Sequence, residues 1–255
     1  MCIIVYKPAG KKLPSKDILE ACEVNNPDGG GYMIHKDGMV YFKKGFMDFK
    51  DFWQSIQSEG DLTPYHVGIH FRIATHGTIC SSMCHPFPIV HSKKELIKTS
   101  GVAKYCAMHN GTIPNFGESM SYYSYYTKKS KKKKSEINLS DTAEFIKDCL
   151  TLLKDKLHLK RCQKLISKLI DGSRMLIFTP NKIILLGNWI KDNGIYYSNS
   201  SYKTVKTYSF YSSKDYKKDD FFKCDYCGEL HESWEKREFG GLCLCEDCYQ
   251  LIKGV

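Results

Sequence analysis

Residues 66–77, His-Val-Gly-Ile-His-Phe-Arg-Ile-Ala-Thr-His-Gly, constrain the fold of this chain more than any other segment. Apolar side chains alternate over residues 67–73, which predicts a strand with one face in the core. The glycine that ends the segment predicts a turn. Loops at the ends of rigid elements often carry sites, so Arg72, Thr75 and His76 are candidate site residues. Taken singly, each is more typical of an ordinary strand or loop than of a site.

Strand and helix patterns alternate along the chain, which predicts a mixed α and β fold. The apolar run at residues 2–6 predicts a buried strand, and residues 32–35 and 39–42 predict a hairpin. Residues 25–31 end in three consecutive glycines and are otherwise rich in turn formers, which predicts a loop. Aromatic and aliphatic side chains recur at helical spacing over residues 48–59, which predicts a helix packed on the core.

His109-Asn110-Gly111 ends a strand that is predicted over residues 102–108. An Asn-Gly pair most often forms the turn of a hairpin. The alternative is functional, because the Asn110 side chain and the Gly111 N–H could both donate to a developing negative charge, as an oxyanion hole requires. Further helices are predicted over residues 15–22, 141–153 and 159–169, and a further hairpin over residues 174–179 and 183–186.

The composition predicts a folded cytoplasmic protein with one large domain and a small appendage. The chain has 255 residues, of which 42% are hydrophobic, enough for a substantial core. No apolar run approaches the roughly 20 residues that span a bilayer, and the first residues lack the pattern of a signal peptide. The net charge of +10 comes partly from the lysines of residues 128–134, so it permits a nucleic-acid or acidic partner without implying one.

Cysteines gather near the C-terminus, where five of the twelve lie between residues 224 and 248. The polar residues 206–222 predict a linker between a domain at residues 1–205 and a small domain at residues 223–255. The small domain carries two Cys-x2-Cys pairs with 17 residues between them, at Cys224, Cys227, Cys245 and Cys248. This spacing predicts a zinc ribbon, in which a structural zinc ion supplies the folding energy. Cys243 is either a spare thiol or an alternative ligand to Cys245.

Cys2 follows the initiator methionine and leads the first apolar run. If Met1 is removed, Cys2 carries a free α-amine, whose ordinary pKa of roughly 7.7–8.0 allows it to act as a base near neutral pH. A thiol needs such a base to become a thiolate nucleophile. The alternative is structural, because cysteine is also an ordinary small hydrophobic residue of protein cores.

Six short motifs together resemble those of the class II glutamine amidotransferases, which belong to the N-terminal nucleophile hydrolase superfamily. They follow the order of that family and are Cys2, residues 25–31, residues 72–77, His85-Pro86, residues 109–111 and Ser140-Asp141-Thr142. The resemblance covers roughly residues 2–200 and does not extend to the tail. It implies an α+β fold for the large domain, a four-layer αββα sandwich.

The resemblance also implies the catalytic residues of a glutamine amidohydrolase. Cys2 matches the nucleophile, with its own α-amine as the base. Asn110 and Gly111 match the oxyanion hole. The implied reaction is attack of the Cys2 thiolate on the side-chain amide of glutamine, release of ammonia and hydrolysis of the resulting thioester.

The same resemblance implies how glutamine binds. Arg72 is similar to an arginine that pairs with the α-carboxylate, for which its planar fork is well suited. Asp141 matches an aspartate that holds the α-ammonium, and Ile73, Thr75 and His76 occupy positions that line the same pocket. From the local sequence alone, Asp141 is more typical of a helix N-cap.

Three positions depart from the family pattern. Ile73 stands where an aromatic residue is common, Ile3 stands where glycine usually follows the nucleophile, and Met83-Cys84 replaces the usual Asn-Ala. These changes concern the finer shape of the pocket and its preference for glutamine. The polar residues expected to bind an amino acid are present, at Arg72, Asn110 and Asp141.

The sequence leaves three functions open. The first is a glutamine amidohydrolase that passes ammonia to a separate synthase, because no nucleotide-binding motif appears in the chain. The second is an N-terminal nucleophile hydrolase of another γ-glutamyl or related amide, which the changes at Ile73 and Met83 allow. The third is a non-enzymatic module that binds nucleic acid through the zinc ribbon and the lysines of residues 128–134. That lysine run is more often a solvated insertion.

Overall fold

The computed structural model of the chain consists of two compact units, Met1–Thr204 and Val205–Val255. The part of the chain that it describes comprises residues 2–73, 79–114, 116, 139–203, 221–223, 230–232, 236–239, 242–246 and 249–250. Within these residues, no helix is both long enough and apolar enough to cross a membrane.

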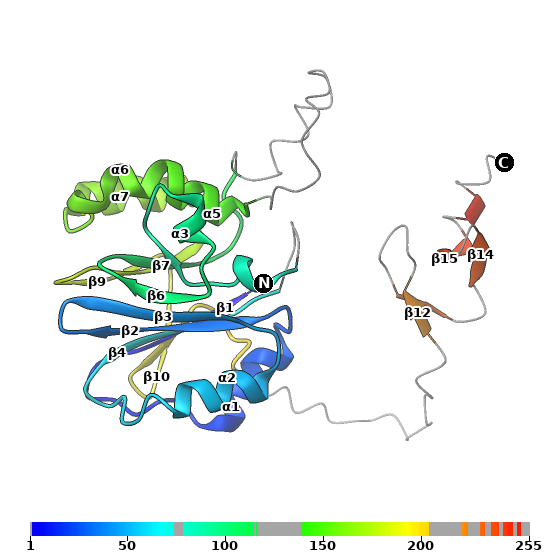
Figure 1. Cartoon of the computed structure of the whole chain (residues 1–255), viewed down its shortest axis with the longest axis horizontal. Helices are drawn as coiled ribbons and strands as arrows, with labels where there is room; N and C mark the ends of the chain where they lie inside the picture. Colours follow the sequence, from blue (N-terminus) through cyan, green and yellow to red (C-terminus); the bar gives the residue numbers. More distant parts are fainter. Residues whose placement is uncertain are drawn as a thin grey trace, which may run out of the picture. The chain divides into compact units, whose positions relative to one another are not determined.

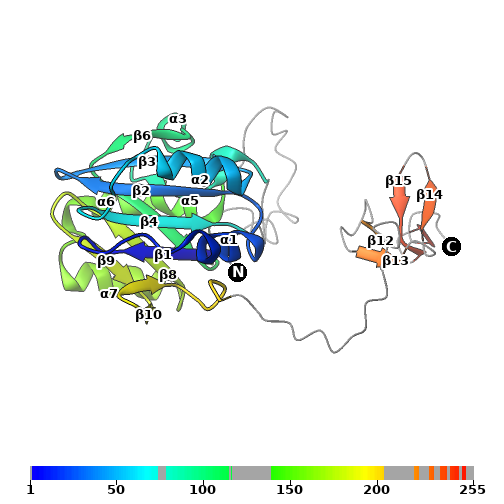
Figure 2. The same cartoon turned by 90° about the horizontal axis from the view of Figure 1, so that it is seen from below.

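An antiparallel sheet of seven strands organises the first unit, in the order β10-β11-β1-β4-β2-β3-β6. Its strands are β10 (Ile190–Asp192), β11 (Ile195–Tyr197), β1 (Ile3–Lys7), β4 (His66–Phe71), β2 (Gly30–Lys36), β3 (Met39–Phe46) and β6 (Ser100–Ala103). Figure 2 shows β3, β2, β4 and β1 following one another across this sheet. The strand predicted at residues 2–6 is therefore confirmed as an interior strand, and all five residues of β1 are buried.

A second antiparallel sheet has the order β5-β7-β8-β9. Its strands are β5 (Phe87–Pro88), β7 (Cys106–Asn110), β8 (Arg174–Phe178) and β9 (Ile183–Leu186). The hairpin predicted over residues 174–186 is confirmed as β8 and β9. The single strand predicted over residues 102–108 is wrong, because the chain leaves the first sheet after β6 and enters the second at β7. The apolar pattern continues through this crossing, since both sheets bury their side chains in the same unit.

Helices cover the outer face of each sheet. The α-helices are α1 (Lys16–Val24), α2 (Phe49–Gln57), α3 (Lys93–Leu96), α5 (Asp141–Phe145), α6 (Thr151–Leu153) and α7 (Lys160–Leu169). A π-helical segment, Ile146–Leu150, joins α5 to α6, so the helix predicted over residues 141–153 is continuous. Figure 1 shows α1 and α2 on one side of the stacked sheets and α5, α6 and α7 on the other. The structure thus confirms a mixed α and β fold with antiparallel sheets.

Three hydrophobic clusters fill the spaces between the sheets and helices of the first unit. Alternation along β1 divides its side chains, because Ile3 and Val5 join the cluster beneath α1 and α2, while Ile4 and Tyr6 face the other sheet. On the opposite face of that inner cluster lie Met108 and Leu176, from β7 and β8. A third cluster fills the space between the second sheet and the helices that include α5 and α7. The first strand is therefore fixed from both sides.

Helix starts follow the predicted patterns, with one correction. Asp48 caps α2, since its carboxylate accepts a hydrogen bond of 2.7 Å from Lys50 N. The residue that caps α5 is Ser140, whose Oγ accepts from Ala143 N at 3.2 Å. Asp141 is instead the first residue of that helix. The N-cap interpretation of Asp141 is wrong, because the neighbouring serine takes the position.

The glycines at the start of β2 correct a second expectation. The turn formers of residues 25–31 predict a loop throughout, but β2 already begins at Gly30. A β-carbon on Gly31 would lie 2.2 Å from the carbonyl oxygen of His85. Glycine is needed at this position because the backbone of His85 packs closely against β2. The frequency of glycine in turns does not predict such a contact.

The second unit contains two short hairpins in its described residues. They are formed by β12 (Phe221–Lys223) with β13 (Leu230–Glu232), and by β14 (Arg237–Phe239) with β15 (Leu242–Leu244). Cys245 follows β15 directly and is buried. The other predicted zinc ligands, Cys224, Cys227 and Cys248, lie outside the described residues, so the zinc ribbon stays a prediction. Within the described residues, no group of three or more His, Cys, Asp or Glu side chains could hold a metal ion.

Candidate active site

Cys2 lies immediately before β1 and is held by two loops from distant parts of the sequence. Its thiol donates a 3.5 Å hydrogen bond to the carbonyl oxygen of Ile73, which follows β4. Its own carbonyl oxygen accepts a 2.7 Å hydrogen bond from Nδ2 of Asn199, which follows β11. Both neighbours of β1 in the sheet thus contribute a contact to Cys2, which fixes the position of its backbone and thiol.

The thiol of Cys2 does not ionise readily in this environment. Burial raises the pKa of the Cys2 thiol, and the positive charge of Arg72 opposes part of that rise. Since the thiolate is the nucleophilic form, Cys2 needs a base to react near neutral pH.

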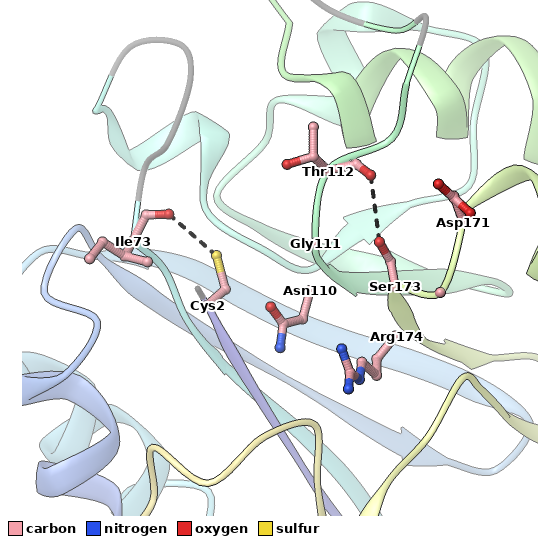
Figure 3. A pocket seen from close by; sticks show the side chains of 9 residues that line it. Cys2, Ile73, Asn110, Gly111, Thr112, Asp171, Ser173 and Arg174 are labelled. Atoms are coloured by element: carbon pink, nitrogen blue, oxygen red, sulfur yellow. Dashed lines mark hydrogen bonds between the residues drawn. The ribbon is translucent and has the colours of Figure 1, made fainter.

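Asn110 and Gly111 lie beside Cys2 at the end of β7 (Figure 3). The strand that precedes Gly111 pairs with β5, which lies earlier in the sequence, and with β8, which begins only at Arg174 after helices α5 to α7. The Asn-Gly pair is therefore not the turn of a two-residue hairpin, the more common interpretation of this dipeptide. The Asn110 side chain is buried, with Nδ2 at 2.7 Å from Oγ of Ser198 and Oδ1 without a hydrogen-bond partner among the described residues.

Gly111 is required by its surroundings. Its φ of +145° lies in a region that side-chain-bearing residues rarely adopt. A β-carbon there would also lie 2.0 Å from Oγ of Ser173 and 2.6 Å from its Cβ. The backbone of Gly111 is consequently packed directly against Ser173 on the side on which any other residue would carry its side chain.

A pocket of about 280 Å³ opens onto these residues. Four of its lining residues were predicted from the sequence, and four others lie between α7 and the start of β8. The lining consists of Cys2, Ile73, Asn110, Gly111, Thr112, Asp171, Gly172, Ser173 and Arg174. Sequence reasoning did not single out Asp171, Ser173 or Arg174, because a short polar loop after a helix carries no distinguishing pattern. Their part in the pocket is visible only once α7 is packed against the second sheet.

Arg72 is buried next to this pocket but is not one of its described lining residues. Only 5% of its surface is exposed. Its backbone N–H donates to the carbonyl oxygen of Gly29 at 2.8 Å, and its carbonyl oxygen accepts from Asp28 N at 2.9 Å. The glycine-rich segment before β2 is therefore bound to the end of β4. Thr75 and His76 lie outside the described residues.

Asp141 connects the start of α5 to the segment that follows the oxyanion candidates. Its Oδ2 accepts a 2.7 Å hydrogen bond from Ile113 N, and its Oδ1 accepts another of 2.7 Å from Thr142 N. The carboxylate thus stabilises the loop after Gly111. Oδ1 also accepts from Oγ1 of Thr142 at 3.4 Å. A carboxylate has about four acceptor sites, so Asp141 can accept a further hydrogen bond.

Comparison with known proteins finds similar solved structures but no similar sequence. No family model matches the chain, and no curated protein matches its sequence. Similar solved structures include the glutamine phosphoribosylpyrophosphate amidotransferase from B. subtilis in complex with ADP and GMP, at 15% identity and a TM-score of 0.40. Another is described as the allosteric regulatory enzyme of purine biosynthesis, at 13% identity and a TM-score of 0.41. Each match covers 77% of this chain and 41% of the other, so this chain spans less than half the length of either protein.

Three buried histidines form a neutral cluster next to the candidate site. Nδ1 of His85 lies 2.8 Å from Nε2 of His70, which lies 3.1 Å from the carbonyl oxygen of His109. Nδ1 of His109 lies 2.9 Å from Oγ1 of Thr142. Burial lowers the pKa of His70 to about 3 and that of His109 to about 4, and it lowers the pKa of His85 well below its ordinary value. The cluster joins β4, β7 and α5 without introducing charge.

Proposed function

We propose that this chain is a glutamine amidohydrolase of the class II glutamine amidotransferase type, with Cys2 as its nucleophile. The observation that carries the proposal is that Cys2 and the Asn110-Gly111 pair, which are far apart in sequence, line one pocket. These residues supply a thiol, a side-chain amide and a backbone N–H, the groups that acyl transfer through a thioester needs. The resemblance of the six sequence motifs supports the same reaction.

The reaction begins with a thiolate at Cys2, which attacks the carbonyl carbon of the glutamine side-chain amide. The electron pair of the C=O bond moves to oxygen, where Asn110 Nδ2 and the Gly111 N–H stabilise the negative charge. The pair then returns, the C–N bond breaks, and ammonia leaves after taking up a proton. Water hydrolyses the Cys2 thioester to give glutamate and the free thiol.

The base that removes the thiol proton is the α-amine of Cys2 itself. This assignment requires that Met1 be removed, since a peptide nitrogen is not basic. The burial that raises the pKa of the Cys2 thiol makes such a base necessary. Once the proton has been transferred, the resulting ammonium can donate it to the leaving ammonia.

Glutamine is held by its amino-acid end. We assign its α-carboxylate to Arg72, because a guanidinium can bind a carboxylate through two parallel hydrogen bonds. Its α-ammonium is assigned to Asp141, with Ile73, Thr75 and His76 around the side chain. The buried position of Arg72 at the end of β4 supports this assignment, since a desolvated charge attracts its partner more strongly.

The experiment that tests the proposed function is ammonia release from glutamine by the purified chain, with its N-terminus defined by intact mass. We expect release by protein that begins at Cys2 and none by Cys2→Ala. A panel of other γ-glutamyl amides separates glutamine hydrolysis from hydrolysis of a related amide. Absence of ammonia from protein that begins at Cys2 would exclude the glutaminase assignment.

Several further assignments belong to this proposal. We assign the fold of the first unit to the four-layer αββα sandwich of N-terminal nucleophile hydrolases. The four cysteines Cys224, Cys227, Cys245 and Cys248 are assigned to a structural zinc ion, and the buried thiol of Cys245 supports this ligand set. We propose that the released ammonia passes to a separate, cytoplasmic synthase, which uses it. Binding of nucleic acid by the lysines of residues 128–134 is the alternative, and those residues lie outside the described part of the chain.

A further inference from the structure

We propose that Ser198 is a positioning residue that holds the Asn110 side-chain amide with Nδ2 turned toward Cys2. This inference rests on the proposed function, because Asn110 matters to the reaction only as an oxyanion donor. It concerns a residue that lies just after β11 and that no sequence motif singled out. The physical basis is the hydrogen-bond capacity of three groups that meet at the Ser198 hydroxyl.

Ser198 joins the two sheets at the candidate site. Its backbone N–H donates to the carbonyl oxygen of Ile4 at 2.9 Å, and the Ile4 N–H donates to its Oγ at 2.8 Å. The same Oγ lies 2.7 Å from Nδ2 of Asn110, at the end of β7. Ser198 and Asn110 are each only 1% exposed, so water does not substitute for a missing partner. One hydroxyl thus contacts both the nucleophile strand and the oxyanion strand.

With Nδ2 of Asn110 facing Ser198 Oγ, two buried groups are unsatisfied. Ser198 Oγ then accepts two hydrogen bonds, from Ile4 N and from Asn110 Nδ2, while the described residues provide no acceptor for its own proton. At the same time, Asn110 Oδ1 is buried without a donor among those residues. Each unsatisfied buried group costs about 1–3 kcal/mol in general, so such pairs are rare in folded proteins.

A rotation of the Asn110 amide by half a turn satisfies the Ser198 hydroxyl. Oδ1 then occupies the position 2.7 Å from Ser198 Oγ and accepts the hydroxyl proton, while Ser198 still accepts from Ile4 N. The two amide orientations have nearly the same shape, and the hydrogen-bond network decides between them. Ser198 can donate only one proton, so it selects the orientation in which it faces the oxygen of Asn110.

This orientation places the amide nitrogen where an oxyanion donor is needed. Figure 3 shows the drawn amide oxygen of Asn110 on the side facing Cys2 and the nitrogen on the side away from it. After the rotation, Nδ2 takes the place of the buried Oδ1 on the side facing Cys2, where the described residues offer its protons no competing acceptor. A carbonyl oxygen in that position would repel the same oxygen as it becomes negative. Ser198 therefore acts on the reaction through Asn110.

The first test is a neutron structure of the protein without substrate, in which deuterium atoms distinguish the two amide orientations. We expect the Ser198 deuteron to point to Oδ1 of Asn110, with the ND2 group of Asn110 facing Cys2. An ND2 group that instead donates to Ser198, with the oxygen facing Cys2, would overturn the inference. This result does not depend on whether glutamine is a substrate, so failure of the proposed function and failure of this inference are distinguishable.

The second test is a kinetic comparison of Ser198→Ala with Ser198→Thr, which retains the hydroxyl. We expect Ser198→Ala to lower kcat for glutamine by about tenfold, with KM changed by less than about twofold, and Ser198→Thr to restore most of kcat. In an Asn110→Ala background, Ser198→Ala should have no further effect on kcat. An undiminished effect in that background, or a change confined to KM, would assign Ser198 to structure alone. Ser55→Ala, which removes a hydroxyl bonded to Tyr32 at 2.8 Å, is the matched control.

Discussion

A β-carbon on Gly111 would lie 2.0 Å from the hydroxyl oxygen of Ser173, closer than any non-bonded contact allows. The segment between α7 and β8 therefore packs directly against the backbone of the oxyanion candidate. The contact explains why a residue without a side chain is needed there. It also connects the far wall of the pocket to the end of β7.

Gly111→Ala should abolish ammonia release and lower the free energy of unfolding by about 2–4 kcal/mol, since it combines overpacking with an unfavourable φ. Urea denaturation measures the loss. Gly10→Ala is the matched control, because Gly10 also has a positive φ but a β-carbon at that position would have nothing within 4 Å. It should lose about 1 kcal/mol. Adding Ser173→Gly should recover part of the Gly111→Ala loss, and a lack of recovery would contradict the packing explanation.

Exposure of the Cys2 α-amine should switch the activity on. A version that carries a cleavable leader before Cys2 should release no ammonia, because the nitrogen of Cys2 is then an amide. Proteolytic removal of the leader should restore activity, as measured by ammonia release before and after cleavage. The same leader before Cys2→Ala controls for the protease. Equal activity with the leader attached would show that another group is the base.

Arg72 and Arg174 should differ in their effect on glutamine binding. Arg72→Lys retains the charge but loses the fork that binds a carboxylate, so we expect KM for glutamine to rise about tenfold or more. Arg174 lines the pocket, and its Nε already donates to the carbonyl oxygen of Asn188 at 3.2 Å. Arg174→Lys should change KM by less than about threefold. Steady-state kinetics of both variants decide which arginine binds the α-carboxylate, and the reverse order would reassign it to Arg174.

The buried histidine cluster should make the fold sensitive to acid. Burial lowers the pKa of His70 to about 3 and that of His109 to about 4, whereas an unfolded histidine has a pKa near 6.5. Between about pH 6.5 and pH 4 the unfolded chain binds more protons, so the free energy of unfolding falls as the pH falls, by up to about 1.4 kcal/mol per pH unit for each histidine. Urea denaturation at several pH values measures this slope.

Substitution of one member tests the origin of that slope. His70→Gln should reduce it, and His158→Gln, at an exposed position, should leave it unchanged. A slope that is the same in both variants would assign the acid sensitivity to other groups.

The C-terminal unit should bind one zinc ion per chain. Metal analysis of the purified protein measures the stoichiometry, and Cys245→Ala should abolish binding because a three-thiolate site holds zinc more weakly. Cys243→Ala is the matched control and should retain the metal. Removal of zinc with a chelator should unfold residues 223–255 without changing the melting of the first unit. If zinc persists in Cys245→Ala but is lost in Cys243→Ala, the fourth ligand is Cys243 and not Cys245.

Long periodic segments of the fold could be predicted from the sequence, and crossings between sheets could not. The helix expected over residues 48–59 is found at Phe49–Gln57, because its apolar stripe packs against one sheet. The strand expected over residues 102–108 divides into β6 and β7, since burial on both sides of the crossing keeps the apolar pattern unbroken. Strands β10 and β11 have three residues each, too few to carry a period.

The candidate site was predictable where a motif identified its residues. Cys2, Ile73, Asn110 and Gly111 were expected together and do line one pocket. Ser198 could not be foreseen, because its importance comes from an oxygen atom shared with Ile4 and Asn110, and a serine in a polar loop has no local signature. Tertiary contacts of this kind form only when both sheets are in place.

The hydroxyl of Ser198 contacts β1 and β7 from a position that the ribosome synthesises long after either strand. Contacts over such large sequence separations form late in folding, because the entropy of closing long loops must be overcome first. A nascent or partly folded chain therefore carries Cys2 without an oriented Asn110. Recovery of ammonia release during refolding would consequently report that the last strands have formed. A chain that ends before them would release no ammonia.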